Sequence, residues 1–262
     1  MGYTVVVGLG PAGPELLNGA TLDALRRVPR RYLRPGRHPA AAAVTDASTF
    51  DEVYDSARSL EEVYGRIVDA LVEAAADGDV VYAVPGSPLV AERSVELLRA
   101  DPRVAVEMVP AMSFLDLAWA RLGVDPVAAG VRLVDGRRFA VEAAGERGPL
   151  LVAQCDARHV LSDVKLAVDD GPDVQVLQRL GLPDESVTTV AWDDLDRAVE
   201  PDHLTCLYLP VLAAPVAGEV AAFAELVRTG KAPPFPLEDA LANMRVIDAV
   251  FRSAGSGHFV DV

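Results

Sequence analysis

Cysteine, lysine and histidine are scarce in this sequence of 262 residues, and their positions exclude several kinds of site. Cys155 and Cys206 are the only cysteines; they lie far apart in apolar stretches and match neither a redox CxxC motif nor a zinc-binding pattern. We expect them to be buried free thiols, as is usual in a cytoplasmic protein. The four histidines are scattered along the chain, so we expect no metal site and no catalytic triad.

Long apolar runs and net positive charge are also missing. No apolar stretch approaches the roughly 20 residues that a membrane span needs. The first residues run straight into a strand-like stretch, so we expect no signal peptide. The formal net charge of −15 disfavours nucleic acids and anionic membranes as partners, because both require a basic surface. We therefore expect a cytoplasmic protein that acts on a small-molecule substrate and binds neither nucleic acid nor membrane.

The first 122 residues alternate apolar strand-like stretches with helical patterns. This alternation is typical of a parallel sheet whose strands are joined by right-handed helical crossovers. The predicted strands are 3–8, 31–34, 79–84 and 104–109. The predicted helices are 14–27, 60–76, 89–99 and 113–122.

After Gly123, strands outnumber helices, which predicts a second, mixed sheet. The strands predicted there are 131–134, 150–155, 174–180, 187–192 and 204–209, with one clear helix at 157–168. Helical patterns return at 218–228 and 237–254, and a last short strand is predicted at 258–262. The expected fold class is α/β, with a parallel N-terminal sheet, a mixed C-terminal sheet and a helical C-terminal tail. The corresponding parts are an N-terminal α/β domain (1–110), a C-terminal α/β domain (111–213) and the tail (214–262).

A glycine-rich loop, Gly8-Leu9-Gly10-Pro11-Ala12-Gly13, follows the first predicted strand and precedes a helix. Glycines let the backbone turn sharply and approach a ligand. The loop matches the G-x-G-x-x-G pattern of dinucleotide-binding proteins, but Pro11 removes an N–H and no acid follows the second strand. Arg34 stands there instead, an arginine that would suit a 2′-phosphate. The loop alone therefore leaves a ligand site, an NAD(P) site and an ordinary tight turn open.

Two further loops follow predicted strands, at the sheet edge where open α/β folds bind ligands. The segment 82–92 contains Pro85-Gly86-Ser87-Pro88, a rigid turn whose backbone groups can recognise the polar atoms of a ligand. The segment 110–114 contains Ser113, which either caps the next helix or faces the same cleft.

Taken in order, these stretches resemble the tetrapyrrole (corrin/porphyrin) methylases, and most closely the methylase-like domain at the N-terminus of MazG-type and YabN-type proteins. The resemblance covers residues 1–212 and includes the segments 6–13, 32–39, 82–92, 110–114 and 151–155. It implies a tetrapyrrole-methylase-like fold with S-adenosylmethionine in a cleft between two α/β domains, and hence an S-adenosylmethionine-dependent methyltransferase. The cofactor-binding residues that it implies are Pro11, Pro85, Gly86, Ser87, Val90, Ser113, Phe114 and Gln154.

The resemblance also assigns residues to the substrate, without identifying it. Arg34 and His38 fit the MazG-linked subgroup and are expected to bind the substrate, although His38 is equally interpreted as a loop residue bonded to backbone. Tetrapyrrole enzymes usually carry Gly-Gly-Asp-Pro where this chain has Pro-Gly-Ser-Pro, so an acidic contact is missing at Ser87. The sulfonium of the cofactor already activates the methyl group, so no particular catalytic residue is expected.

The tail departs from MazG-type proteins, because it lacks the paired glutamates of a magnesium-dependent pyrophosphohydrolase. Residues 223–262 instead resemble the C-terminal end of Gfo/Idh/MocA-type oxidoreductases, a part that carries neither nicotinamide nor the catalytic lysine. Two alternatives therefore stay open: an NAD(P)-dependent oxidoreductase, and a non-catalytic ligand-binding module on the methylase fold. The family resemblance also implies a homodimer. An apolar stripe in the tail is expected to pack at its interface or on its own chain: Leu237, Leu241, Met244, Ile247 and Phe251.

Overall fold

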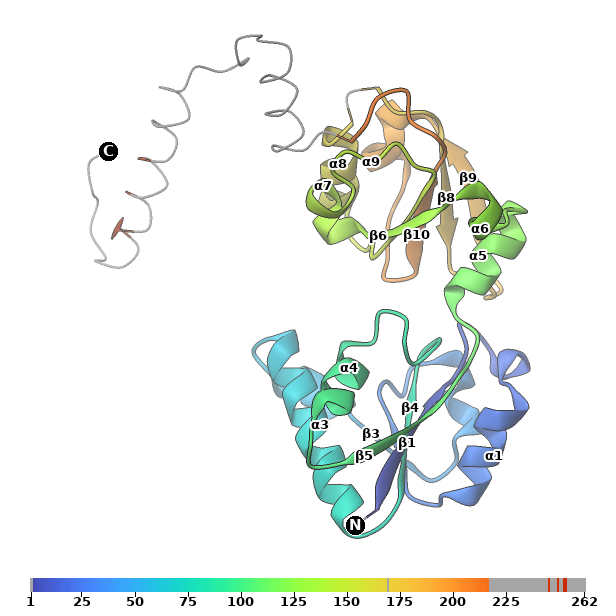
Figure 1. The fold of residues 1–262 in the computed structure, drawn as a ribbon, viewed down its shortest axis with the longest axis vertical. Helices are drawn as coiled ribbons and strands as arrows, with labels where there is room; N and C mark the ends of the chain where they lie inside the picture. The colour runs from blue at the N-terminus through green and yellow to red at the C-terminus, as the bar shows by residue number, and fades with distance from the viewer. Residues whose placement is uncertain (1, 169, 217–244, 246–248, 250–251, 254–262) are drawn as a thin grey trace.

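The computed structural model describes residues 2–168 and 170–216, together with residues 245, 249, 252 and 253. Within this range the chain forms two α/β units in succession, each built on one five-stranded sheet (Figure 1). The predicted tail helices and terminal strand lie outside the described residues, apart from those four positions. In the described part of the chain, no helix is both long and apolar enough to cross a bilayer.

The first sheet is parallel throughout, as predicted, with the strand order β3-β2-β4-β1-β5. Its strands are β1 (Tyr3–Gly8), β2 (Arg31–Leu33), β3 (Ala47–Thr49), β4 (Val80–Val84) and β5 (Ala105–Val109). The central strands β1 and β4 are covered on both faces, which explains their mostly apolar sequences. The sequence does not predict β3, because its three residues show no apolar alternation and two of them are exposed.

Helices cover both faces of this sheet (Figure 1). α1 (Gly19–Arg27) packs on one face with Val5 and Val7, whereas α3 (Leu60–Ala76) and α4 (Arg93–Ala100) pack on the other face with Val6. Alternate residues of β1 therefore belong to different hydrophobic cores, as the two-residue period of a strand requires. Three short helices complete the unit: η1 (Pro14–Leu16), η2 (Pro39–Ala43) and α2 (Asp51–Ser56).

Two predicted helices begin later than their apolar patterns indicate. The predicted helix 14–27 is divided, because η1 ends at Leu16 and α1 begins only after Asn18. The side-chain oxygen of Asn18 accepts a hydrogen bond from the Thr21 backbone N–H at 2.8 Å, which makes Asn18 the N-cap. The predicted helix 89–99 begins at Arg93, because Ala91 has a φ of 56° that an α-helix excludes.

The second sheet is mixed, as predicted, with the order β6-β7-β10-β8-β9. Only β6 and β7 run parallel, and the other pairs are antiparallel. Its strands are β6 (Arg132–Asp135), β7 (Leu150–Ala153), β8 (Val174–Gln178), β9 (Ser186–Val190) and β10 (Thr205–Leu209). Its helices are α5 (Phe114–Leu122), α6 (Pro126–Ala129), η3 (Gly136–Arg138), α7 (Phe139–Glu142), α8 (Arg158–Leu166), η4 (Trp192–Asp194) and α9 (Leu195–Ala198).

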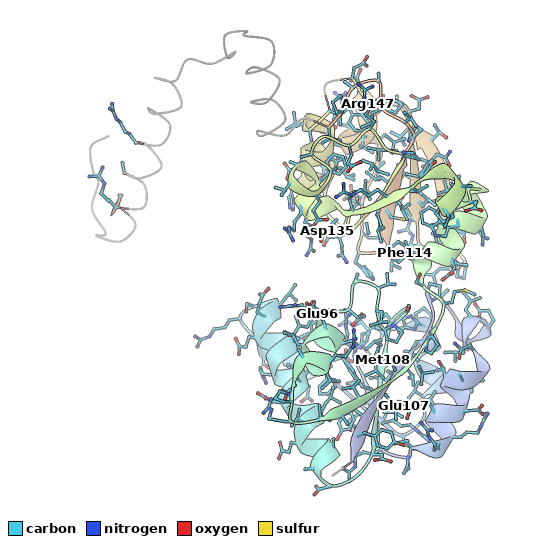
Figure 2. All side chains as sticks on the ribbon, viewed as in Figure 1. Glu96, Glu107, Met108, Phe114, Asp135 and Arg147 are labelled. Carbon is cyan, nitrogen blue, oxygen red and sulfur yellow. The ribbon has the colours of Figure 1, made fainter. Side chains whose placement is uncertain are left out.

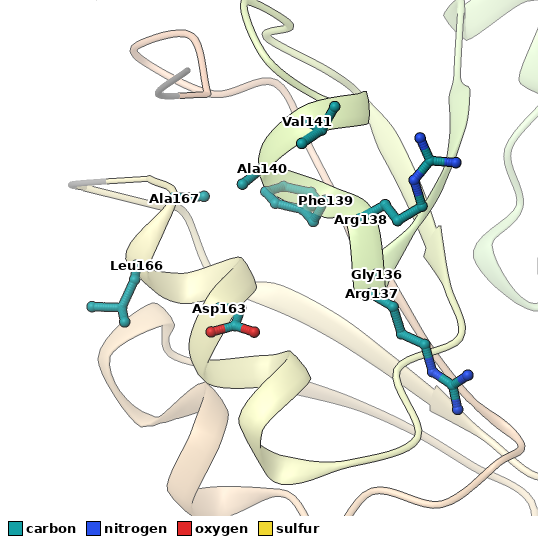
Figure 3. A pocket seen from close by; sticks show the side chains of 9 residues that line it. All are labelled: Gly136, Arg137, Arg138, Phe139, Ala140, Val141, Asp163, Leu166 and Ala167. Atoms are coloured by element: carbon teal, nitrogen blue, oxygen red, sulfur yellow. The ribbon is translucent and has the colours of Figure 1, made fainter. Parts of the chain in front are cut away.

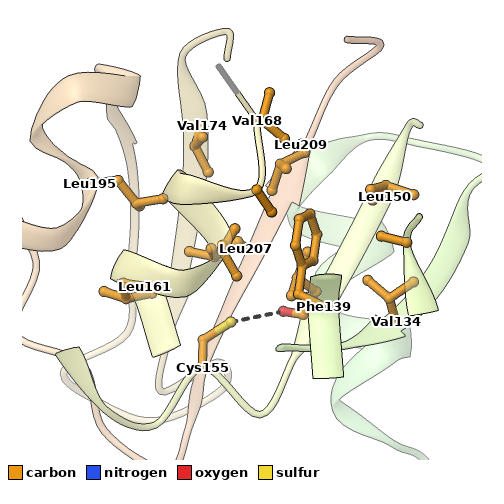
Figure 4. Packing of buried hydrophobic residues seen from close by; sticks show 14 of the residues in the cluster. Val134, Phe139, Leu150, Cys155, Leu161, Val168, Val174, Leu195, Leu207 and Leu209 are labelled. Atoms are coloured by element: carbon orange, nitrogen blue, oxygen red, sulfur yellow. Dashed lines mark hydrogen bonds between the residues drawn. The ribbon is translucent and has the colours of Figure 1, made fainter. Parts of the chain in front are cut away.

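The main core of the second unit lies between this sheet and α7, α8 and α9 (Figure 4). Phe139, Leu161 and Leu207 are among its fully buried side chains. The two cysteines are free and buried, as predicted. Burial raises the pKa of the Cys206 thiol to about 12, so this thiol is protonated and unreactive at neutral pH. The opposite face of the sheet packs against α5.

One connection, residues 110–113, leads from β5 of the first unit to α5 of the second. Figure 2 shows Phe114 at this junction. The side-chain N–H of Asn18 donates to the Pro110 carbonyl oxygen at 2.7 Å and so fixes the start of the connection. The units also meet at Gly181, where an added Cβ would lie 2.8 Å from the Ala12 Cβ. A side chain at Gly181 would therefore push the second unit away from residues 8–13.

Candidate functional site

β1 and β4 are neighbours, yet the chain leaves them toward opposite faces of the sheet. It continues from β1 to α1 on one face and from β4 to α4 on the other (Figure 1). Such a reversal is the topological switch point at which open α/β sheets bind ligands. Residues 8–13, the glycine loop, and residues 85–88, the Pro85 turn, both begin at this point.

The glycine loop and the Pro85 turn are bonded to each other. The Gly86 N–H donates to the Gly10 carbonyl oxygen at 2.8 Å, and the Gly10 N–H donates to the Gly86 carbonyl oxygen at 3.2 Å. Both glycines have a positive φ, 74° and 59° respectively. A Cβ at Gly8 would lie 2.2 Å from the Gly86 carbonyl oxygen, whereas a Cβ at Gly86 would meet no protein atom within 4 Å. The backbone is thus tightly packed on one side of Gly86 and open on the other.

The other predicted cofactor residues of the first unit surround this bridge. Pro11, Pro85, Ser87 and Val90 are all half-buried. The Ser87 carbonyl accepts a hydrogen bond from the Val90 N–H at 3.1 Å, which closes the turn after Gly86. The structure therefore brings the predicted residues of the glycine loop and of the segment 85–90 together at one edge of the sheet.

Gln154 comes from the second unit, immediately after β7. It is half-buried and holds a φ of 60°. A non-glycine residue in this region costs on the order of 1 kcal/mol, and such strain is concentrated at ligand sites. Among the described residues, no hydrogen bond links Gln154 to the glycine loop or to the Pro85 turn.

Ser113 acts as the N-cap of α5. Its hydroxyl accepts a hydrogen bond from the Leu115 N–H at 3.1 Å and donates to the Asp116 carboxylate at 3.3 Å. Asp116 also accepts the Ser113 backbone N–H at 2.7 Å, which completes a capping box. Of the two interpretations left open by the sequence, the geometry favours the helix cap. Phe114, at the start of α5, is half-buried against the second sheet.

His38 likewise has a structural arrangement. Its Nδ1 accepts a hydrogen bond from the Ala40 N–H at 3.2 Å, and a second hydrogen bond joins the ring to the Gly10 backbone. Burial lowers the pKa of His38, opposed by the bond to Gly10, so the ring is neutral at neutral pH. His38 therefore caps η2 through Nδ1 and is bonded to the glycine loop at Gly10, which favours its interpretation as a loop residue over substrate binding.

Arg34 belongs to a buried polar network that sequence reasoning missed. Its Nη1 donates to the Glu92 carboxylate in a close ion pair, and the Ser94 hydroxyl lies 3.5 Å from the other Glu92 oxygen. The Tyr82 hydroxyl lies 2.8 Å from Ser94. Burial raises the pKa of Glu92 to about 7, although Arg34 opposes this rise. The only sequence signal for this network was Glu92, a single acid that follows an apolar strand and a turn within 82–92.

Two surface hollows accompany these features. One, of about 560 Å³, lies between η1 and the connection to α5 and borders the glycine loop; its lining includes Leu16, Asn18 and Met112. The other, of about 320 Å³, lies between α7 and α8 and shares no residue with the predicted site (Figure 3). No group of three or more potential metal ligands occurs among the described residues.

The space beside Gly86 is consistent with S-adenosylmethionine as the cofactor. The N–H groups of Gly10 and Gly86 are used in their mutual hydrogen bonds, so these glycines offer a ligand the second lone pair of each carbonyl oxygen and the open space beside Gly86. Pro85 and Val90, which flank Gly86 in the same segment and are half-buried, offer apolar surface. The described residues at this edge thus fit such a ligand.

Comparison with known proteins identifies the class. The sequence profile of the tetrapyrrole (corrin/porphyrin) methylases matches residues 4–196, so the chain belongs to that family. It is 33% identical over 220 residues to the uncharacterized protein YabN of Bacillus subtilis (strain 168), an alignment that covers 80% of this chain and 45% of that protein. The chain therefore spans about half the length of this relative.

Solved structures share the fold. The uroporphyrin-III C-methyltransferase of Thermus thermophilus, solved with S-adenosylhomocysteine, superposes with a TM-score of 0.58 at 22% identity, covering 80% of this chain and 97% of that one. The precorrin-6Y methylase of Archaeoglobus fulgidus gives a TM-score of 0.62 at 21% identity, covering 80% and 98%. The predicted two-unit tetrapyrrole-methylase-like fold is confirmed for the described residues.

Proposed function

We propose that this chain is an S-adenosylmethionine-dependent methyltransferase that acts on a small-molecule acceptor. The observation that carries the proposal is the mutual hydrogen bonding of Gly10 and Gly86 at the switch point, with open space beside Gly86. Membership of a methylase family supports the same activity. A likeness to a methyltransferase solved with S-adenosylhomocysteine agrees with it.

In this proposal each predicted residue has a part in holding the cofactor. The backbone of Pro85, Gly86 and Ser87, together with Val90, contacts its methionine end, and Pro11 forms the floor of the site. Phe114 and Gln154 contact the rest of the molecule from the second unit. Ser113 contributes through the helix it caps, since its hydroxyl is already engaged.

S-adenosylmethionine, when bound, supplies a methyl group already activated by the sulfonium. The residues of this chain are then required to hold the acceptor in line and to exclude water. The rigidity of the Pro85 turn holds the methionine end of the cofactor in place for an in-line attack, because its hydrogen bonds to the glycine loop fix its position.

The two alternatives predict different behaviour. An NAD(P)-dependent oxidoreductase would bind a nicotinamide cofactor, which family membership disfavours. A non-catalytic module would bind S-adenosylmethionine but transfer no methyl group. We also propose a homodimer, in line with the resemblance to the family; its interface is left to experiment.

A thermal-shift measurement tests the proposal. A ligand that binds only the folded chain raises its unfolding temperature by mass action. S-adenosylhomocysteine is expected to raise it and NADPH to leave it unchanged. A rise with NADPH and none with S-adenosylhomocysteine would refute the proposal. Binding without detectable methyl transfer from S-adenosylmethionine to any small-molecule acceptor would favour the non-catalytic module.

A further inference from the structure

One loop of the second unit packs directly on the glycine loop of the first. This loop, residues 179–185, joins β8 to β9 and is the Gly181 loop. A Cβ added at Gly181 would lie 2.8 Å from the Ala12 Cβ and 2.9 Å from the Leu117 Cδ1. The Leu117 side chain can rotate away, but Ala12 is fully buried and its Cβ moves only with the backbone. A shift of the Gly181 loop toward the first unit would therefore displace the glycine loop.

The Glu185 carboxylate fixes the conformation of the Gly181 loop. Its Oε2 accepts the Gly181 backbone N–H at 2.6 Å and an Arg121 Nη2–H at 3.1 Å, and its Oε1 accepts from the Arg121 Nε in a close ion pair. The hydrogen bond from Arg121, together with the one from Gly181, holds the pKa of Glu185 below its ordinary value. Glu185 is therefore anionic at neutral pH and keeps both partners.

Arg121 connects this loop to the junction between the units. It lies on α5, which begins at Phe114 directly after the connection 110–113. Leu117 precedes Arg121 by one helical turn, so both side chains project from the same face of α5 toward the Gly181 loop. The Gly181 loop is thus held between α5 on one side and the glycine loop on the other.

The glycine loop is the part of the candidate site that this contact reaches. Ala12 follows Pro11 in the chain, and Gly10, two residues earlier, exchanges the hydrogen bonds with Gly86. A binding site keeps its affinity only while packing holds its backbone in the productive geometry. In the proposed function the cofactor contacts both units, so its affinity depends on how the loops of the two units are placed.

We propose that Glu185 is a positioning residue for the cofactor: it holds Gly181 against Ala12, and the second unit thereby sets the geometry of the glycine loop. Glu185 acts through the loop and needs no contact with the ligand. Naming the ligand as S-adenosylmethionine rests on the proposed function, whereas the coupling between the two loops does not.

Calorimetric titration of S-adenosylhomocysteine into variants of the full chain tests the positioning role. Glu185→Ala frees the Gly181 loop, so the dissociation constant should rise about tenfold. Glu185→Gln keeps an acceptor for the Gly181 N–H and should restore most of the affinity, a rescue that a role of the charge alone would not give. Glu146→Ala is the matched control, because it breaks a close ion pair with Arg132 in the same unit; its affinity should equal that of wild type.

A second pair of variants displaces the glycine loop without touching Glu185. Gly181→Ala and Gly145→Ala place a methyl group at nearly the same φ, 81° and 79°, but the one at Gly145 meets no atom within 4 Å. Gly181→Ala should weaken S-adenosylhomocysteine as Glu185→Ala does, and Gly145→Ala should leave it unchanged.

The carbon-13 methyl resonance of Ala12, recorded without ligand, reports the contact itself. It is expected to shift in Glu185→Ala and Gly181→Ala and to stay in place in both controls. An unshifted resonance in Glu185→Ala and Gly181→Ala would overturn the coupling between the loops, and affinities equal to those of the controls would overturn the positioning role. Failure of the wild type to bind S-adenosylhomocysteine would instead overturn the proposed function, while the Ala12 resonance would still decide whether the loops are coupled.

Discussion

Replacing Gly86 by leucine separates what the backbone requires at this position from what a bound cofactor requires. The φ of 59° disfavours any L side chain, at a cost of about 1 kcal/mol to the free energy of unfolding. Outside its two chain neighbours, no protein atom lies within 4 Å of the added Cβ, so the side chain begins in open space. The variant should therefore fold with a small loss of stability.

The loss of cofactor affinity should be far larger. A leucine side chain would occupy the open space beside the glycine bridge, so the dissociation constant for S-adenosylhomocysteine should rise about 100-fold or more, about 2.7 kcal/mol. Gly130→Leu is the matched control: Gly130 has a φ of 65° and likewise no neighbour within 4 Å of an added Cβ, but it lies after α6. It should show the same small loss of stability and unchanged affinity.

Isothermal titration calorimetry gives both affinities, and thermal unfolding followed by circular dichroism gives both stabilities. If Gly86→Leu folds and binds S-adenosylhomocysteine as tightly as Gly130→Leu, the cofactor does not lie against Gly86. If Gly86→Leu is much less stable than Gly130→Leu, the space beside Gly86 is not open to a side chain.

Three further predictions concern pH, the connection between the units, and assembly. The raised pKa of Glu92 stabilises the fold at low pH, and this contribution is lost as the pH rises through about 7. Relative to Glu92→Gln, wild type should therefore lose about 2–3 kcal/mol of unfolding free energy between acidic and mildly alkaline pH, measured by chemical denaturation. The same pH dependence of unfolding free energy in both proteins would contradict this. Asn18→Ala removes the α1 cap and the bond to Pro110, so chemical denaturation should show a loss of about 1–2 kcal/mol of unfolding free energy. Asn18→Asp keeps the cap but not the bond to Pro110, so it should recover part of that free energy. No recovery would mean that the cap contributes little. Light scattering should give the mass of two chains for the full-length protein, and a chain ending at residue 229 should weaken the dimer if the apolar tail stripe packs at the interface. A monomer at high concentration would exclude the dimer, and an unchanged dimer without the tail would exclude the tail's part in it.

The parallel sheet was predictable because burial on both faces leaves a direct trace in the sequence. β1 and β4 are short apolar runs that end in glycine- and proline-rich turns, and this combination indicates both the sheet and the edge at which ligands bind. Ser113 could also be recognised as a cap, from a serine placed directly before a helical pattern. Features of this kind depend on neighbours within a few residues.

The polar network could not be predicted, because its partners meet only through the strand order. Arg34 and Glu92 are 58 residues apart, and they become neighbours only when β2 pairs with β4. The positive φ of Ala91, which delays α4, also leaves no clear trace in its residue type. The division of the predicted first helix at Asn18 depends on which residue caps it, and a helical apolar pattern does not report that.

Calorimetric titration of S-adenosylhomocysteine into the purified chain, with NADPH as the comparison, tests the central claim most directly. The account predicts saturable binding of S-adenosylhomocysteine at one site per chain, and no heat of binding with NADPH. Binding of NADPH without binding of S-adenosylhomocysteine would contradict the claim that the switch point between β1 and β4 holds the cofactor of a methyltransferase.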